Sequence, residues 1–111
     1  MDASIKYAEL QSLIESGASP LIIDVRRRPA FSAAQDMIAG AAWRDPEQVA
    51  AWAPHIPRAG RVVVYCVHGH EVSQNAAKAL NQAGIAAQYL EGGIEEGWKG
   101  AGGAVQARRD G

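Results

Sequence analysis

The chain has 111 residues, of which 48% are hydrophobic and 21% charged, so we expect one folded domain and not a disordered chain. Eleven Lys and Arg oppose twelve Asp and Glu, and this net charge of -1 argues against a protein that binds nucleic acid by neutralising phosphates. One cysteine excludes an intramolecular disulfide, and no apolar run approaches the roughly 18 residues of a membrane span. We expect a soluble cytoplasmic protein that binds neither nucleic acid nor membrane, with 1–111 as a single domain and 104–111 as a flexible tail.

Apolar strand-like runs alternate with helix-like segments, and glycines, prolines and capping residues separate them. The run 61–65 is the strongest strand signal, because every residue after Arg61 is β-branched or aromatic. In chain order, the sequence predicts a helix capped by Ser4 and ended by Gly17, a strand at 21–25, a helix at 29–35, a strand at 38–43, a helix at 45–53, a strand at 61–65, a helix at 73–83, a strand at 85–90 and a helix at 94–100. Short strands separated by helices predict an α/β fold, a small parallel sheet flanked by helices on both faces.

A parallel sheet carries its chemistry outside the carboxyl ends of its strands, and Cys66 directly follows the strongest strand. A loop from Cys66 to Val72 then leads into the helix predicted at 73–83. The N–H groups of such a loop and helix start lack intrahelical partners, and the helix dipole adds positive charge. We therefore expect a cradle that favours the thiolate over the thiol and binds an anion. A buried, inert cysteine is the alternative, and the polar loop with its glycine argues against it.

Charged residues near the end of the strand at 21–25 lie on the same sheet edge as Cys66. A guanidinium at Arg26 can pair with a dianionic substrate at the mouth of the pocket. Arg27 and Arg28 either add positive potential there or form a solvated run of charge. We expect Asp24 to orient the loop backbone or an arginine, and not to act as a catalytic acid.

Two histidines, His68 and His70, flank Gly69 in the loop. Either one donates a proton or a hydrogen bond to the substrate, or both are exposed loop residues. The spacing of Cys66, His68 and His70 does not predict a metal site, because a tight loop cannot turn three side chains onto one ion.

Three sequence blocks in this order resemble the single-domain rhodaneses, a family of sulfurtransferases. The first block is 21–26 (LIIDVR), which matches a strand ending in Asp-x-Arg. The second is 63–69 (VVYCVHG), which matches the strand and loop of the nucleophile. The third is 89–94 (YLEGGI), a glycine pair followed downstream by Trp98. The resemblance extends over residues 4–103.

The resemblance implies a rhodanese-like fold and transfer of sulfur from thiosulfate or a persulfide donor. The Cys66 thiolate would attack the outer sulfur of the donor and keep it as a persulfide. A thiol, a dithiol or cyanide would then accept the sulfur, and no metal or cofactor is required. Residues assigned to substrate binding are Val67, His68, Gly69, His70, Glu71, Val72 and Arg26, with Asp24 behind them.

The loop departs from the rhodanese pattern at Glu71, where many members carry Arg. A Glu71 carboxylate that points into the loop would repel thiosulfate, whereas one that points outward would not. Glu71 could also favour a neutral or cationic acceptor. Ala76 and Ala77 fall one position late in the following helix, so the loop has either six or seven residues. Seven is the pattern of Cys-based phosphatases and arsenate reductases, but those enzymes need Arg where this chain has Val72. A phosphatase or arsenate reductase, or a non-catalytic regulatory module, remains the alternative function.

Overall fold

The computed structural model describes residues 3–57 and 60–109. Its main sheet is parallel and has the order β1-β6-β5-β2-β4. In that order the strands are Ser4–Ile5, Ala87–Leu90, Val62–Tyr65, Leu21–Asp24 and Ala42–Trp43. A second, antiparallel sheet pairs β3 (Asp36–Ile38) with β7 (Val105–Ala107). The strands predicted at 21–25, 61–65 and 85–90 are confirmed within two residues.

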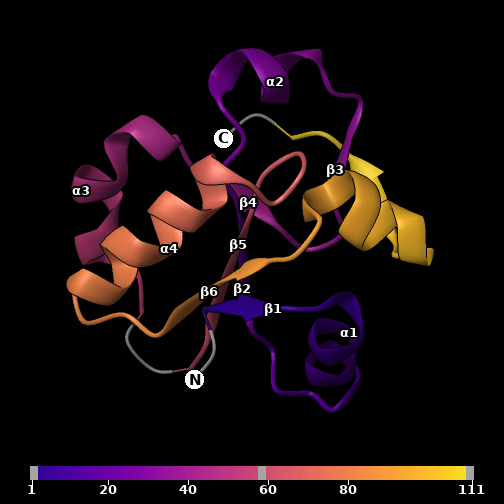
Figure 1. Ribbon diagram of the computed structural model, residues 1–111, viewed down its shortest axis with the longest axis horizontal. Helices are drawn as coiled ribbons and strands as arrows, with labels where there is room; N and C mark the ends of the chain where they lie inside the picture. Colours follow the sequence, from indigo (N-terminus) through magenta and orange to yellow (C-terminus); the bar gives the residue numbers. More distant parts are fainter. Residues whose placement is uncertain (1–2, 58–59, 110–111) are drawn as a thin grey trace.

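Helices cover both faces of the main sheet, which confirms the predicted α/β class (Figure 1). Helices α3 (Val49–Trp52) and α4 (Glu71–Gln82) lie on one side, and α1 (Tyr7–Glu15) lies on the other. The remaining helical segments are α2 (Arg28–Ala33), the short 3-10 segments η1 (Pro46–Gln48), η2 (Ala53–His55) and η4 (Lys99–Ala101), and the π-helical η3 (Gly93–Trp98).

The side chains of β5 show how this layering follows from the sequence. Successive side chains of a strand point to opposite faces. Val62 and Val64 accordingly pack with α3 and α4, whereas Val63 and Tyr65 pack with α1 and η3. All four are buried because β5 also has a neighbouring strand on each side. With both faces covered, the carboxyl ends of the strands are the natural place for a site.

The first predicted helix begins later than its sequence indicates. Ser4 does not cap it, because Ser4 and Ile5 form the edge strand β1 beside β6. The carbonyl of Ile5 accepts a hydrogen bond of 2.9 Å from the N–H of Glu91, and the Ile5 side chain is fully buried. Burial of this β-branched side chain at the sheet edge therefore outweighs the capping signal, and α1 begins at Tyr7.

Two other predicted elements are each divided in the structure. The strand predicted at 38–43 is interrupted by a turn in which Gly40 has a φ of +84° and Ala41 N–H donates to Ile38 O at 3.0 Å. The helix predicted at 45–53 is present as η1, α3 and η2 in succession. Its predicted cap is confirmed, because Asp45 Oδ1 accepts from Glu47 N–H at 2.9 Å.

The loop after Cys66 is shorter than predicted. Helix α4 begins at Glu71 and not at Ser73, so residues 66–70 connect it to β5. The helix predicted at 29–35 is confirmed as α2, which ends before Ala34 because that residue is extended. The helix predicted at 94–100 begins one residue earlier than predicted, at Gly93, and is π-helical as far as Trp98.

The segment expected as a flexible tail contains β7, which differs from the prediction. Trp98 explains why the chain is held here: its Nε1 donates to Ala104 O at 2.8 Å. A Cβ on Gly103 would lie 2.4 Å from that indole ring, so only glycine allows the chain to cross it. Beyond β7, Arg108 Nε donates to Ala34 O at 3.0 Å.

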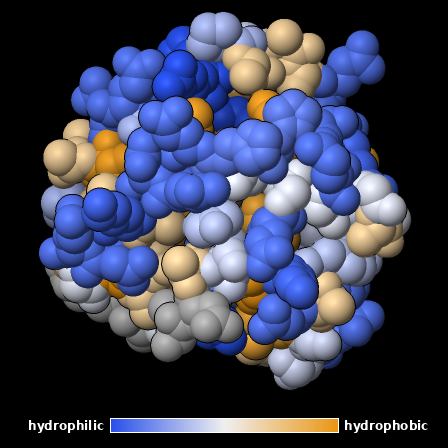
Figure 2. All heavy atoms as spheres, in the orientation of Figure 1, coloured by the Kyte–Doolittle hydropathy of each residue, from blue (hydrophilic) through white to orange (hydrophobic). Residues whose placement is uncertain are grey.

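The surface in the view of Figure 2 is mostly hydrophilic, with small apolar patches between the hydrophilic residues. Among residues 3–57 and 60–109, Ile14 and Val105 are the large hydrophobic side chains that are exposed. No helix in this described part of the chain has the length and apolar character of a membrane span.

Candidate active site

Cys66 lies at the carboxyl end of β5, where it lines a cavity of about 330 Å³. The residue is 5% exposed, and this cavity is the opening through which a reagent can approach its sulfur among the described residues. The other residues that line the cavity are Arg26, Arg27, Ala30, Val67, His68, His70, Glu71 and Val72. The structure therefore brings together most of the predicted site residues, whereas Gly69 and Asp24 are buried and do not line the cavity.

The backbone of the loop is oriented by η3. The carbonyls of Cys66 and Val67 accept hydrogen bonds of 3.0 Å from the N–H groups of Ile94 and Glu95. Within residues 3–57 and 60–109, the N–H groups of 67–72 donate to no protein acceptor. Unpaired amides at the start of a helix are available for an anion. The predicted cradle thus has the free donors that it needs.

Close backbone contact fixes the loop against the turn between β6 and η3. Gly69 has a φ of +74°, and a Cβ there would lie 2.7 Å from Gly92 N and 2.8 Å from Leu90 O. A Cβ on Gly93 would lie 2.4 Å from Val67 O. The glycine pair of the third sequence block therefore serves the nucleophile loop, by letting η3 approach its carbonyls.

Ser73 is a site residue that the sequence analysis missed. Its Oγ lies 3.1 Å from Cys66 Sγ, and the residue is fully buried in the first turn of α4. A hydroxyl at this distance can donate to an ionised sulfur, and a hydrogen bond to a charged acceptor is stronger than a neutral one. The signal available in the sequence was a polar residue one turn into a helix whose neighbours on the same face, Ala76 and Ala77, are buried.

Arg26 lines the cavity as predicted, but its guanidinium is held within the protein. Its Nη2 lies 2.6 Å from Asp24 Oδ2, with 3% and 0% of the two side chains exposed, and also donates to Asp36 O at 2.9 Å. Burial lowers the pKa of Arg26, but hydrogen bonds and the charge of Asp24 raise it to a net value above the ordinary one. The cation is therefore balanced by Asp24 and is not free for a substrate dianion.

Tyr65 completes this buried polar cluster directly before the nucleophile. Its hydroxyl donates to Asp24 Oδ2 at 3.0 Å and accepts from Ile38 N–H at 3.1 Å. Burial and the negative charge of Asp24 raise the pKa of Tyr65 well above its usual range. Asp24 thus orients an arginine, as the sequence analysis expected, and ties β2 to the residue that precedes Cys66.

The exposed side chains at the cavity mouth carry opposite charges. His68 Nδ1 lies 2.9 Å from Glu96 Oε1 on the surface. Arg27 and Glu71 are both exposed, and neither has an ionic partner in the part of the chain that the structure describes. Arg27 is thus the cation available at this mouth. No group of three or more His, Cys, Asp or Glu in that part is arranged to hold a metal ion.

Comparisons with known proteins agree with this geometry. The family model described as rhodanese-like domain matches residues 6–101, whereas no curated protein matches the chain. A full-length protein from Lactobacillus plantarum is 27% identical with a TM-score of 0.84, covering 95% of this chain and 88% of its own. A rhodanese-related protein from Thermoplasma volcanium is 25% identical with a TM-score of 0.78, covering 95% and 98%. A protein of unknown function from Rhodopseudomonas palustris, described as a possible tyrosine phosphatase, is 27% identical with a TM-score of 0.77, covering 93% of this chain and 83% of its own.

Proposed function

The chain belongs to the rhodanese-like domain family, and we propose that it is a sulfurtransferase that carries sulfur as a persulfide on Cys66. The donor is thiosulfate or an organic persulfide, and the acceptor is a thiol, a dithiol or cyanide. The observation that carries this proposal is the environment of Sγ: a cavity lined by a loop with free N–H groups, with the Ser73 hydroxyl 3.1 Å away.

The chemistry follows from these contacts. The Cys66 thiolate attacks the outer sulfur of thiosulfate, the bond between its two sulfurs breaks, and the electron pair leaves with sulfite. The free amides of 67–72 stabilise the negative charge on the donor and then on the outer sulfur of the persulfide. Cys66 Sγ as a thiol donates to Ser73 Oγ at 3.1 Å, and the same hydroxyl can turn its hydrogen toward Sγ when the sulfur carries a negative charge.

The similarity to the Rhodopseudomonas palustris protein, which is described as a possible tyrosine phosphatase, favours the phosphatase alternative. Cys-based phosphoryl transfer needs a cation that balances three equatorial oxygens in the transition state. The loop provides Glu71 and Val72 in the positions where such a cation would stand, and Arg26 is paired with Asp24. Sulfur transfer, in which the transferred atom is a single sulfur, fits this loop better.

Mass spectrometry after incubation with thiosulfate tests the proposal. We expect a gain of one sulfur, about 32 Da, on Cys66, and its absence in Cys66→Ala. Ser73→Ala should slow persulfide formation by about tenfold, because one hydrogen bond to a charged group is lost. Ser16→Ala, which removes an exposed hydroxyl that donates to Leu13 O, is the control and should have no effect. Wild-type protein that forms no persulfide with thiosulfate or glutathione persulfide would refute the proposal, as would turnover of an aryl phosphate that Cys66→Ser abolishes.

A further inference from the structure

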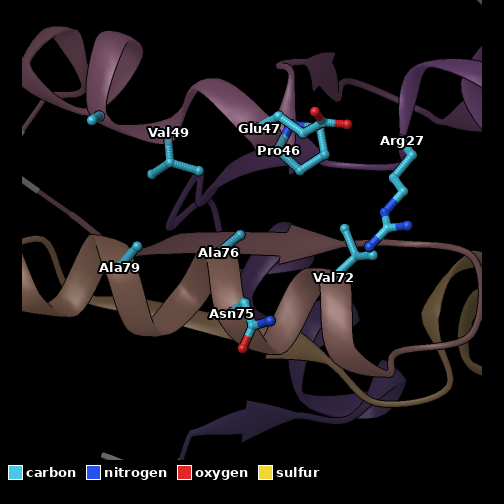
Figure 3. A pocket seen from close by; sticks show the side chains of 9 residues that line it. Arg27, Pro46, Glu47, Val49, Val72, Asn75, Ala76 and Ala79 are labelled. Atoms are coloured by element: carbon cyan, nitrogen blue, oxygen red, sulfur yellow. The ribbon is translucent and has the colours of Figure 1, made fainter.

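A second cavity, which we call the side groove, adjoins the cavity of Cys66. It has a volume of about 360 Å³ and lies between α4 and the segment η1–α3 (Figure 3). Arg27 and Val72 line both cavities, so the side groove continues directly from the pocket of the nucleophile. The other residues that line it are Pro46, Glu47, Val49, Ala50, Asn75, Ala76 and Ala79.

The walls of the side groove are mostly apolar and are held in place by the fold. Ala76 and Ala79 of α4 leave space opposite Pro46 and Val49, as Figure 3 shows. The wall that carries Glu47 is fixed by the cap at η1, where Glu47 N–H donates to Asp45. Trp52 Nε1 donates to Asp45 O at 2.8 Å and anchors α3 to the same residue. A cavity between such fixed elements exists before any ligand binds.

Two charges of opposite sign stand along this apolar groove. Arg27 extends toward Val72, at the end that joins the Cys66 cavity, and Glu47 stands on the wall next to Pro46 (Figure 3). Within residues 3–57 and 60–109, neither side chain has an ionic partner. A ligand that complements the groove therefore has an anionic group near its sulfur, an apolar stretch and a cationic group farther away.

We propose that the side groove binds the organic part of a zwitterionic thiol of small-peptide size, which accepts the sulfur from Cys66. Arg27 pairs with its carboxylate, Glu47 pairs with its ammonium group, and the apolar walls contact the chain between them. A volume of about 360 Å³ is within the range of small-molecule sites, whereas cyanide would leave it empty. This inference rests on the proposed function, because it names the acceptor of the same persulfide.

The transfer step requires no further reactant. The thiolate of the acceptor attacks the outer sulfur of the Cys66 persulfide and forms a new S–S bond with it. The bond between the outer sulfur and Sγ breaks, and its electron pair returns to Sγ as the thiolate. The outer sulfur, which is anionic when it comes from thiosulfate, takes up one proton from solvent before the attack and leaves with it as the persulfide of the acceptor. Ser73 then donates to the regenerated thiolate.

Substitution of a groove residue tests the proposal, with glutathione as the peptide-sized acceptor and cyanide as the small one. Ala50→Phe should fill the side groove, and Ala51→Phe is the matched control, because both residues are exposed on α3 but Ala51 lines neither cavity. We expect the ratio of kcat/KM for glutathione to kcat/KM for cyanide to fall by about tenfold in Ala50→Phe and to be unchanged in Ala51→Phe.

The charge contact is tested separately with N-acetylated glutathione, which lacks the ammonium group. Glu47→Gln should lower kcat/KM for glutathione several-fold but leave that for the acetylated acceptor as it is in wild type. If both variants still form the persulfide and have the same ratio of kcat/KM for glutathione to kcat/KM for cyanide, the proposal for the side groove is wrong but the proposed function is not. Failure of wild type to form a persulfide would overturn both proposals. If Ala50→Phe slowed transfer to reduced thioredoxin but not to glutathione, the occupant would be a protein and the proposal would be wrong.

Discussion

Gly69→Ala is the substitution that most directly tests how the nucleophile loop is held. Two separate penalties meet at this position. Gly69 has a φ of +74°, in the left-handed region that L residues avoid, and its missing Cβ would lie 2.7 Å from Gly92 N and 2.9 Å from Gly93 N. Both nearby atoms belong to backbone, so they cannot move aside as the end of a flexible side chain could.

The expected loss of stability follows from these two terms. A left-handed conformation costs an L residue about 1 to 2 kcal/mol. Forcing a methyl group into a packed contact costs about 1 to 3 kcal/mol more. Together Gly69→Ala should lower the free energy of unfolding by about 2 to 5 kcal/mol. Gly17→Ala is the matched control, because its φ is +80° but no atom lies within 4 Å of the added Cβ. Gly17→Ala should lower the free energy of unfolding only by the cost of the left-handed conformation, about 1 to 2 kcal/mol.

Urea denaturation of wild type and both variants measures these values, and the rate of persulfide formation is the second readout. We expect Gly69→Ala to slow that rate as well, because relief of the contact moves the loop amides relative to Sγ. Gly17 lies at the end of α1, remote from the loop in sequence and element, so its variant should react like wild type. Equal losses of stability in the two variants would refute the argument from close backbone contact.

Two further predictions concern the buried polar cluster beneath the loop. Asp24→Asn should lower the free energy of unfolding by about 3 kcal/mol, because it leaves the Arg26 cation buried without its partner. Asp36→Asn, which breaks the partly exposed ion pair with Lys99, is the control and should lower it by no more than about 1 kcal/mol. Chemical denaturation measures both losses. The pKa of Tyr65 is raised, so its contribution to stability is complete below the ordinary value of 10.0 and is lost as the pH rises above it. Between pH 10 and 11 wild type should therefore lose up to about 1.4 kcal/mol more than Tyr65→Phe, and a Tyr89→Phe control that behaves like Tyr65→Phe would contradict this assignment.

The main sheet could be predicted because its strands have strong local signals. Val62, Val63 and Val64 are β-branched and bounded by turns, so the strand is evident from sequence alone. The edge strand β1 could not be predicted, because two residues give no period and its pairing with β6 is distant in sequence. The same holds for β7, whose partner β3 lies about 70 residues earlier in the chain.

The position of the nucleophile could be predicted for a different reason. The carboxyl edge of a parallel sheet is defined once the strands are known, and Cys66 follows the central one. Ser73 could not be assigned, because its contact with Sγ depends on where α4 begins, and the sequence placed that start two residues late. An error of two residues rotates a helix by more than half a turn, which exchanges buried and exposed faces.

The two neighbouring arginines show why the role of a charged residue cannot be predicted from its position in the sequence alone. Arg26 and Arg27 are adjacent, and both lie at the carboxyl edge beside Cys66. Arg26 points into the fold, where it forms several hydrogen bonds with the carboxylate of Asp24, and a substrate would have to displace a buried ion pair to use it. Arg27 precedes α2 as its N-cap residue, is exposed and has no ion pair among the described residues, so it can bind an anion without breaking a salt bridge there. Arg27 lines both the Cys66 cavity and the side groove, so in the proposed function Arg27, and not the Arg26 of the sequence motif, is the residue that would bind the negative charge of the ligand, at the junction of the two cavities.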